Sequence, residues 1–274
     1  LEEEESMKKL ILAIAIAAIF VTGSMVYAGQ FGPLEPAAKE GKTALGVGYF
    51  YYSAKWKTKD VGWDESKVTQ NQAYLQLGYG VAKNWEAYLR VGGADSKLKD
   101  VFTTNADDST RAGFKSDFKD GYKPFGTIGV KGVFNVTPSF GIGPFLQASL
   151  YSSYKDSTSG TVSGYSETQE WKVKKPREIN LGIGLQGKIG ETIIYGGPVA
   201  YWAKAKIQET FKVVGATYVA TGTNTLASST TYKEKNNIGG FAGVRLPLGK
   251  GINIEVEGQM KSKFSFGGAL TYSF

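Results

Sequence analysis

The sequence predicts an all-β fold: a transmembrane, antiparallel, up-and-down β-barrel of about ten strands. Three observations support this prediction. Residues 252–260 alternate apolar and polar side chains, as a strand with two different faces does, and the same pattern recurs along the chain. The connections between the alternating segments are in turn short and long. An apolar stretch typical of a secretory signal precedes all of them.

Ten segments show the two-faced alternation. They are residues 43–55, 69–81, 85–93, 125–135, 140–151, 171–188, 192–206, 233–248, 252–261 and 264–274. In residues 69–81, for example, Leu75 and Leu77 fall on one face, and Gln72 and Gln76 fall on the other. We expect the apolar faces to meet lipid and the polar faces to line the lumen.

Residues 192–206 allow two facings. Lys204 and Lys206 favour an arrangement in which the even-numbered side chains point into the lumen. This choice turns Trp202 inward and predicts the following odd-numbered residues on the lipid face: Tyr195, Val199, Tyr201 and Ala203.

The connections form two sets. The short ones are residues 82–84, 136–139, 189–191 and 249–251, and the long polar ones are residues 56–68, 94–124, 152–170 and 207–232. The two sets fall at opposite strand ends, as in outer-membrane barrels, which have short periplasmic turns and longer outer loops. An even strand number then puts both barrel termini on the periplasmic side. The predicted location is the outer membrane of a Gram-negative bacterium.

Backbone chemistry requires such a sheet to close. Hydrocarbon offers no hydrogen-bond partners, so an open edge in lipid would leave backbone groups unpaired. The outward faces also carry aromatic residues near the strand ends, as a membrane-interface girdle does. The predicted girdle residues are Tyr51, Tyr79, Trp85, Phe134 and Phe140. The alternative is a soluble sandwich or lipocalin-like barrel, which would turn the apolar faces inward.

Residues 7–28 have the parts of a signal peptide. Lys8 and Lys9 precede an apolar run, and Val26 and Ala28 are small residues where a signal peptidase recognises its site, so we expect cleavage after Ala28. The alternative, a retained helical anchor, has an apolar run shorter than the roughly 20 residues that a membrane helix needs. The predicted organisation is a cloning or upstream-translation scar (1–6), a signal peptide (7–28), a periplasmic N-terminal lead (29–42) and the barrel (43–274).

Charge and composition limit the function. The formal net charge is +7, and it becomes about +9 once the two lysines and four glutamates upstream of residue 29 are removed. For an exported barrel this balance favours anionic lipid head groups or solutes, and we expect no nucleic-acid partner. Cysteine is absent, so no disulfide forms.

The sequence also argues against catalysis. Histidine, the side chain that takes and returns a proton most readily near neutral pH, is absent, so we expect no enzyme activity. We expect no cofactor and no metal. The acidic residues of connection 94–124 favour a solvated loop over a cation site, because they lack a glycine-punctuated ligand pattern. They are Asp107, Asp108, Asp117 and Asp120.

Charged and amide side chains on the inward faces define the candidate site. They are Gln76, Glu86, Arg90, Lys131, Gln147, Lys188, Arg245, Glu255 and Glu257. The turn at 249–251 predicts Arg245 opposite Glu255, Gly243 opposite Glu257 and Leu248 opposite Ile252. Two interpretations stay open: an ion-pair plug in a rigid barrel, or a narrow water-filled path with weak charge selectivity.

Two phrases of the sequence carry a family resemblance. The hairpin LQLGYGVAKNWEAYLRVG (75–92) and the ending GALTYSF (268–274) resemble the opacity-type outer-membrane β-barrel proteins of Gram-negative bacteria. The resemblance implies eight to ten strands, no cofactor, and a role in surface contact or small-solute passage. It also implies an assembly signal at Leu270, Tyr272 and Phe274, read by the barrel-assembly machinery, although the usual glycine falls one residue early, at Gly268.

The leading functional interpretation is a narrow porin-like channel for small solutes. About eight strands leave a barrel interior that side chains just fill, so ten strands leave little space, to which the many inward glycines add. The alternative is a surface-exposed structural or adhesion barrel with a plugged lumen, which acts through its long outer loops. The predicted partners are the bilayer with its outer-membrane lipids, the assembly machinery and small solutes.

Overall fold

The structure, a computed structural model, describes residues 31–57, 65–99, 111–112, 114–162, 165–214 and 224–274. The predicted signal peptide lies outside these ranges, as do Asp107 and Asp108. Within them, all regular structure is β-strand, and no helix is long and apolar enough to cross a membrane.

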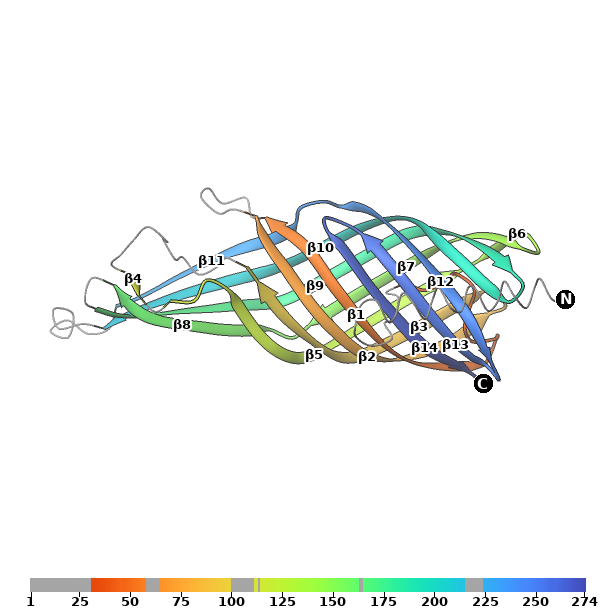
Figure 1. Ribbon diagram of the computed structural model, residues 1–274, viewed down its shortest axis with the longest axis horizontal. Helices are drawn as coiled ribbons and strands as arrows, with labels where there is room; N and C mark the ends of the chain where they lie inside the picture. Colours follow the sequence, from red (N-terminus) through yellow and green to blue (C-terminus); the bar gives the residue numbers. More distant parts are fainter. Residues whose placement is uncertain (1–30, 58–64, 100–110, 113, 163–164, 215–223) are drawn as a thin grey trace.

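Ten strands form a closed antiparallel ring (Figure 1). They are β1 (Thr43–Lys57), β2 (Ser66–Ala82), β3 (Trp85–Leu98), β5 (Phe118–Gly132), β7 (Phe140–Tyr151), β9 (Tyr165–Ile189), β10 (Thr192–Val214), β12 (Ile238–Gly249), β13 (Ile252–Met260) and β14 (Phe264–Ser273). Each pairs with the next, and β14 pairs with β1, so the sheet has no open edge. The predicted fold class, an antiparallel transmembrane barrel, is confirmed.

Four further strands lengthen the wall. They are β4 (Arg111–Ala112), β6 (Phe134–Thr137), β8 (Tyr154–Val162) and β11 (Asn224–Glu234). At the end with the short turns, β6 pairs with β7. At the other end β8 pairs with β9, while β11 bridges β10 and β1 beyond the ends of β12, β13 and β14. At this outer level the described wall therefore consists of β1, β2, β3, β5, β8, β9, β10 and β11.

Two strands run far past the ring. β9 has 25 residues and β10 has 23, whereas a strand crosses a bilayer with about 9–11. Their outer parts, residues 165–177 and 204–214, form a projection together with β8 and β11 (Figure 1). We call this projection the outer extension and the ten-strand part the membrane ring.

This extension corrects the sequence prediction. Residues 152–170 and 207–232 are largely strand, whereas we predicted loops. Their Ser, Thr and Lys residues resembled loop composition, yet their backbones pair in long hairpins. The predicted connections 56–68 and 94–124 are also shorter than expected, because β1, β2, β3 and β5 continue into them.

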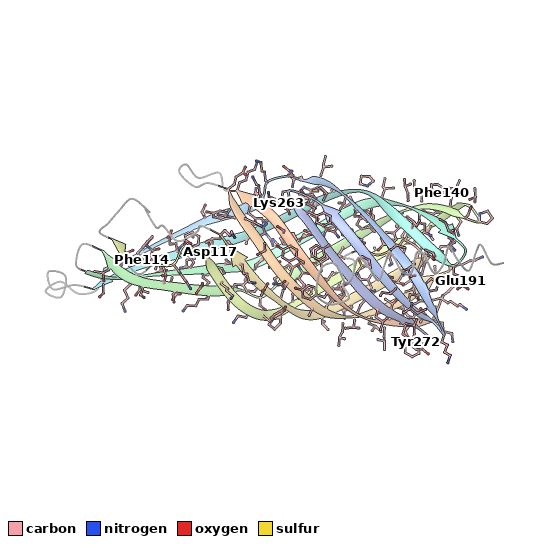
Figure 2. All side chains as sticks on the ribbon, viewed as in Figure 1. Phe114, Asp117, Phe140, Glu191, Lys263 and Tyr272 are labelled. Carbon is pink, nitrogen blue, oxygen red and sulfur yellow. The ribbon has the colours of Figure 1, made fainter. Side chains whose placement is uncertain are left out.

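The outward face of the membrane ring is an apolar belt. Exposed Leu, Ile, Val and aromatic side chains cover the ring strands, with Leu75, Leu89, Leu181 and Ile183 among them. Figure 2 shows outward side chains around the ring, including Phe140 and Tyr272 at the turn end. Exposed apolar residues over the height of a closed barrel require a lipid environment.

The facing predicted for residues 192–206 is wrong. Tyr195, Val199 and Tyr201 are buried inside the ring, whereas Trp202 is 49% exposed on the lipid side. Two lysines misled the prediction, because Lys204 and Lys206 lie in the outer extension, where the outward face meets water.

The hairpin of β12 and β13 follows the prediction in its centre and departs from it near the turn. Arg245 lies opposite Glu255, and Gly243 lies opposite Glu257. A bulge after Pro247 then pairs Gly249 with Ile252, in place of the predicted Leu248. Gly249, Lys250 and Gly251 all have positive φ angles (89°, 51° and 78°), which favours glycine on both sides of the turn.

Candidate functional site

The lumen of the membrane ring holds the charged residues that the sequence singled out. The inward side chains of Glu86, Arg90, Lys131, Gln147, Arg245, Glu255 and Glu257 are buried, Gln76 is half-buried beside Arg90, and Lys188 is half-buried at the turn end. Alternation along antiparallel strands brings them to one inner surface, because every second side chain points inward.

One ion pair of this inner surface joins Arg245 to Glu255. Arg245 donates from Nε to Glu255 Oε1 at 2.8 Å, and its second amino nitrogen lies 2.7 Å from the same oxygen. On the facing side, Lys131 Nζ lies 3.6 Å from Glu86 Oε1. Opposite charges thus compensate one another where an unpaired charge would be costly.

Arg90 joins the amides to the aromatic rings. Its Nε donates to Gln76 Oε1 at 2.6 Å, and its guanidinium lies 4.9 Å from the ring centre of Tyr74 and 4.8 Å from that of Tyr88. Tyr88 in turn donates to Gln147 at 2.8 Å. This packing needs the glycine at 129, since a Cβ there would lie 2.3 Å from the Tyr88 ring.

The N-terminal segment fills the turn end of the lumen, a feature that the sequence analysis missed. We predicted residues 29–42 as a periplasmic lead, but Phe31, Leu34 and Ala38 are buried inside the barrel. We call the described part, residues 31–42, the N-terminal plug. Phe31 packs at 4.5 Å from Phe145 and at 5.1 Å from Phe241, measured between ring centres.

Lumen carboxylates bind the backbone of the plug. Glu257 accepts hydrogen bonds from the amides of Phe31 and Gly32, at 2.9 Å for Gly32. Glu86 Oε2 accepts from the amides of Ala37 and Ala38, at 2.5 and 3.2 Å. These two acids therefore pair with backbone donors that side-chain pairing rules cannot anticipate.

Glu35 fixes the middle of the plug. Its amide donates to Gln186 at 2.9 Å, its carbonyl accepts from Arg245 at 3.1 Å, and its carboxylate pairs with Lys188. Arg245 therefore holds Glu255 and the plug at once. The available sequence signal was the pair of large apolar residues at 31 and 34, the only two in the predicted lead.

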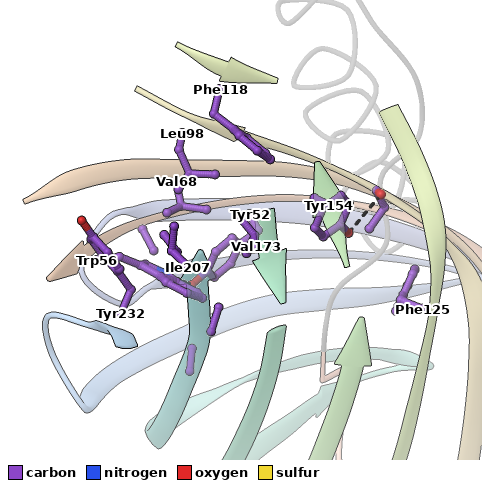
Figure 3. Close-up of a cluster of buried hydrophobic side chains, with 14 of the residues drawn as sticks. Tyr52, Trp56, Val68, Leu98, Phe118, Phe125, Tyr154, Val173, Ile207 and Tyr232 are labelled. Atoms are coloured by element: carbon purple, nitrogen blue, oxygen red, sulfur yellow. Dashed lines mark hydrogen bonds between the residues drawn. The ribbon is translucent and has the colours of Figure 1, made fainter. Parts of the chain in front are cut away.

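An aromatic core closes the lumen at its outer end. Trp171, Tyr154, Tyr232, Phe118 and Leu98 are buried together between the walls of the outer extension and the upper ring. Figure 3 shows Leu98, Phe118, Tyr154 and Tyr232 among the side chains of this cluster. The Tyr154 hydroxyl donates to the carbonyl of Ala94 at 3.1 Å. A cavity among Tyr52, Leu98 and Val173 measures about 20 Å³, room for roughly one water molecule.

A buried lysine links the aromatic core to the polar layer. Lys261 pairs with Glu178, donates to Asn180 at 2.9 Å, and lies 4.9 Å from the ring centre of Tyr201. The lumen is thus occupied at three levels, by the plug, by the ion-pair layer and by the aromatic core.

Of the acidic residues weighed as cation ligands, Asp120 has structural contacts instead. Asp120 accepts from the amide of Lys155 at 2.8 Å and lies 3.6 Å from Lys123 Nζ. Among the described residues, no three His, Cys, Asp or Glu side chains gather as a metal site does.

The predicted girdle residues lie on the outside near the strand ends. Tyr79, Phe134 and Phe140 are exposed at the turn end, and Trp85 packs edge-to-face against Phe134 with ring centres 6.0 Å apart. At the outer end Tyr51 packs at 5.4 Å from Phe266. The terminal residues Leu270, Tyr272 and Phe274 point outward as well, and their role in assembly stays a prediction.

These features define the class of the protein. A closed antiparallel ring, an apolar belt with aromatic ends and a polar lumen make it a transmembrane β-barrel of the Gram-negative outer membrane. That the short turns face the periplasm and the outer extension faces the exterior stays a prediction from the general rule for such barrels. The narrower likeness to opacity-type proteins stays an interpretation.

Comparisons with known proteins give distant structural likenesses. No family model matches the chain, and no curated protein matches its sequence. The solved outer-membrane protease OmpT of Escherichia coli aligns with 92% of this chain and 100% of its own, at 10% identity and a TM-score of 0.43. The NalP autotransporter translocator domain of Neisseria meningitidis aligns over 85% and 88% (12% identity, TM-score 0.43), and the CymD monoaromatic hydrocarbon channel over 86% and 89% (10% identity, TM-score 0.34). Likenesses this distant carry no argument about function.

Proposed function

We propose that the protein is a surface-contact barrel. In this proposal the membrane ring is a closed support, and the outer extension is the part that meets other molecules. The observation that carries it is the occupation of the lumen at three levels, by the plug, the ion-pair layer and the aromatic core.

The outer surface of the extension supports a hydrophilic partner. Its outward side chains are mainly Lys, Ser, Thr and Gln, for example Ser157, Ser159, Lys206 and Thr231. Its own apolar residues point inward, where Trp171 and Ile207 are buried. Such a polar projection suits contact with a soluble or surface-bound molecule better than contact with lipid.

A second candidate is the small-solute channel. The polar contacts of the plug favour this candidate, because water can replace them when the plug leaves. These contacts are hydrogen bonds to Glu86 and Glu257 and an ion pair at Glu35. Gln147 Nε2 and Asn180 Nδ2 are also buried without a partner among the described residues, and such atoms usually bind water. Displacing the plug would open the turn end as far as the aromatic core.

Planar-bilayer conductance separates the two candidates. We expect no conductance steps from the folded wild-type barrel, and none from a variant that lacks residues 31–42, because the aromatic core still closes the outer end. Steps from the wild type would overturn the closed-support proposal. Steps from the deletion variant alone would favour a channel gated by its plug. E86Q/E257Q, which weakens the hold on the plug without deleting it, serves if the deletion variant fails to assemble.

Surface contact is tested by shortening the extension. We expect cells carrying a variant in which a two-residue turn replaces residues 158–169 to lose attachment to the surfaces or cells that the wild type binds. A matched control replaces only Gly190 and Glu191 with Asn-Gly at the periplasmic turn and should attach as the wild type does. Unchanged attachment by the shortened variant would contradict the proposal that the outer extension binds the partner.

We infer that the protein has no catalytic role, because the chain has no histidine and the lumen carboxylates of Glu255 and Glu257 hold an ion pair and backbone amides. Turnover of a peptide, ester or phospholipid substrate by the purified barrel would contradict this inference.

A further inference from the structure

Four cationic side chains form one row across four neighbouring strands. Arg177 of β9 lies opposite Lys204 of β10, and Lys204 lies opposite Lys233 of β11. Lys233 in turn lies opposite Lys57 of β1. All four are exposed on the outside of the wall, so their charges share one surface.

This cation row is unfavourable by itself. Neighbouring strands are about 4.8 Å apart, and like charges directly opposite one another on a sheet destabilise it. None of the four has an ion-pair partner among the described residues. By contrast, Lys55 and Lys235 nearby both pair with Glu65. The row therefore holds a concentration of positive charge that the described protein does not neutralise.

A groove lies against the row. It measures about 980 Å³, and its walls include the four cations, Lys235 and Asn237. One acid, Glu234, is on the same wall, but Glu234 is buried and accepts hydrogen bonds from Tyr52 and Ser262. The groove thus offers a size and a charge suited to an anionic group.

The row marks the outer edge of the apolar belt. Ile179 follows Arg177 by two residues along β9, and Trp202 precedes Lys204 by two residues along β10. Both therefore lie on the same outward faces as the cations, but nearer the membrane. Both side chains are exposed and line the groove. On the other side of β9, Leu150 of β7 lies opposite Arg177 and is exposed too. Cations at this height lie at the level of lipid head groups, with an apolar surface directly below.

We propose that this groove binds the phosphorylated head group of a glycolipid in the outer leaflet. The guanidinium of Arg177 can bind two phosphate oxygens at once, and the lysines add point charges. The sugar hydroxyls meet Asn237 and the Ser and Thr residues of β11, while an acyl chain lies on Ile179 and Trp202. The exposed apolar side chains of Ile179 and Trp202 favour a lipid over a free phosphate ion, because a phosphate ion would contact only the cations.

The test compares two double variants in neutral detergent. K204Q/K233Q removes two charges from the row, and K119Q/K212Q removes two exposed lysines that do not line the groove. Native mass spectrometry with added lipid A should show wild type and K119Q/K212Q retaining the lipid, and K204Q/K233Q binding it at least about tenfold more weakly. Equal weakening in both variants would overturn the site, since general charge would then explain binding.

Three further measurements complete the test. Dephosphorylated lipid A should bind wild type and K204Q/K233Q alike, and inorganic phosphate at millimolar concentration should not displace lipid A from the wild type. Displacement of lipid A by phosphate would overturn the proposal. So would wild-type binding of dephosphorylated lipid A that is as tight as its binding of phosphorylated lipid A. Without lipid, K204Q/K233Q should melt no lower than wild type, because it loses repulsion between like charges. A lower melting temperature would mean that the row serves the fold.

Discussion

The membrane ring and the outer extension are built on the same strands, yet they reverse which face is apolar. In the ring part of β9, Leu181 and Ile183 are exposed while Glu178 and Asn180 are buried. In the extension part of the same strand, Trp171 and Val173 are buried, whereas Lys172 and Lys174 point outward. The strand does not change its facing. The surroundings change from lipid to water, and the favourable side for apolar groups changes with them.

The two regions also stabilise their interiors differently. The ring lumen combines an apolar cluster around Phe31 with charges that pair, as in Arg245 with Glu255, and with carboxylates that hold the plug. The extension depends on burial of aromatic and aliphatic side chains, like a soluble core. A change at one site should therefore act through a different mechanism from the same kind of change at the other.

The largest expected effect is in the extension core. Trp171→Ala removes a fully buried ring and the hydrogen bond that its Nε1 donates to Glu209 at 2.9 Å. We expect the extension to lose about 3–5 kcal/mol of stability, while the ring is unchanged. Hydrogen exchange should accelerate for residues 166–173 and not for residues 179–185. The outward variant Thr210→Ala should leave both regions as they are, and loosening of the ring by Trp171→Ala would show that the two regions are not separate.

The next effect tests the outward faces directly. Leu181→Arg puts a charge on the lipid face, where near the bilayer centre it costs about 2–4 kcal/mol. Gln208→Arg puts the same charge on the outward face of the extension, where we expect a change within about 0.5 kcal/mol. Guanidinium unfolding in lipid vesicles measures both. Similar costs for the two variants would mean that the boundary between lipid and water is misplaced.

A smaller effect is expected in the lumen. Arg245→Ala leaves Glu255 without its partner and frees the carbonyl of Glu35, so we expect a loss of about 1–3 kcal/mol. The double variant R245M/E255Q removes both charges and should recover much of this loss, because no isolated charge then stays buried. An unchanged unfolding midpoint for Arg245→Ala would show that water already solvates this layer.

The smallest effect is a dependence on pH in the extension. The pKa of Glu209 is raised to about 7, because burial and the charge of Glu167 raise it by more than the hydrogen bond from Trp171 lowers it. Between pH 4.5 and 7 the folded chain then holds a proton that the unfolded chain has released. The free energy of unfolding should therefore fall as the pH rises through this window, and stay lowest above it.

Glu209→Gln tests this dependence. The variant should flatten the dependence of extension stability on pH between 4.5 and 7, as followed by Trp fluorescence during unfolding. Glu170→Gln, at an outward position paired with Lys155, should keep the slope of the wild type. A wild-type slope that survives in Glu209→Gln would assign the titration to another group.

The sequence alone determined the closed barrel and most of its facings. Any strand with one face in lipid must alternate apolar and polar side chains, such as Leu or Ile with Gln or Glu, and this is a local property of the sequence. The ten ring strands and the pairing of Arg245 with Glu255 could therefore be predicted from it. The tertiary structure decided where the membrane stops. An outward Lys204 in water and an inward Lys204 in a polar lumen give the same alternation in the sequence. The facing predicted for residues 192–206 was therefore wrong.

The tertiary structure also decided what fills the lumen. Glu86 and Glu257 accept hydrogen bonds from backbone amides of the N-terminal plug. Along the chain, the plug lies more than forty residues from Glu86 and more than two hundred residues from Glu257. No local pattern encodes such contacts, because any extended chain carries the same donors. The cation row also depends on tertiary structure, since Lys57 joins Arg177, Lys204 and Lys233 only when β11 pairs with the distant strand β1.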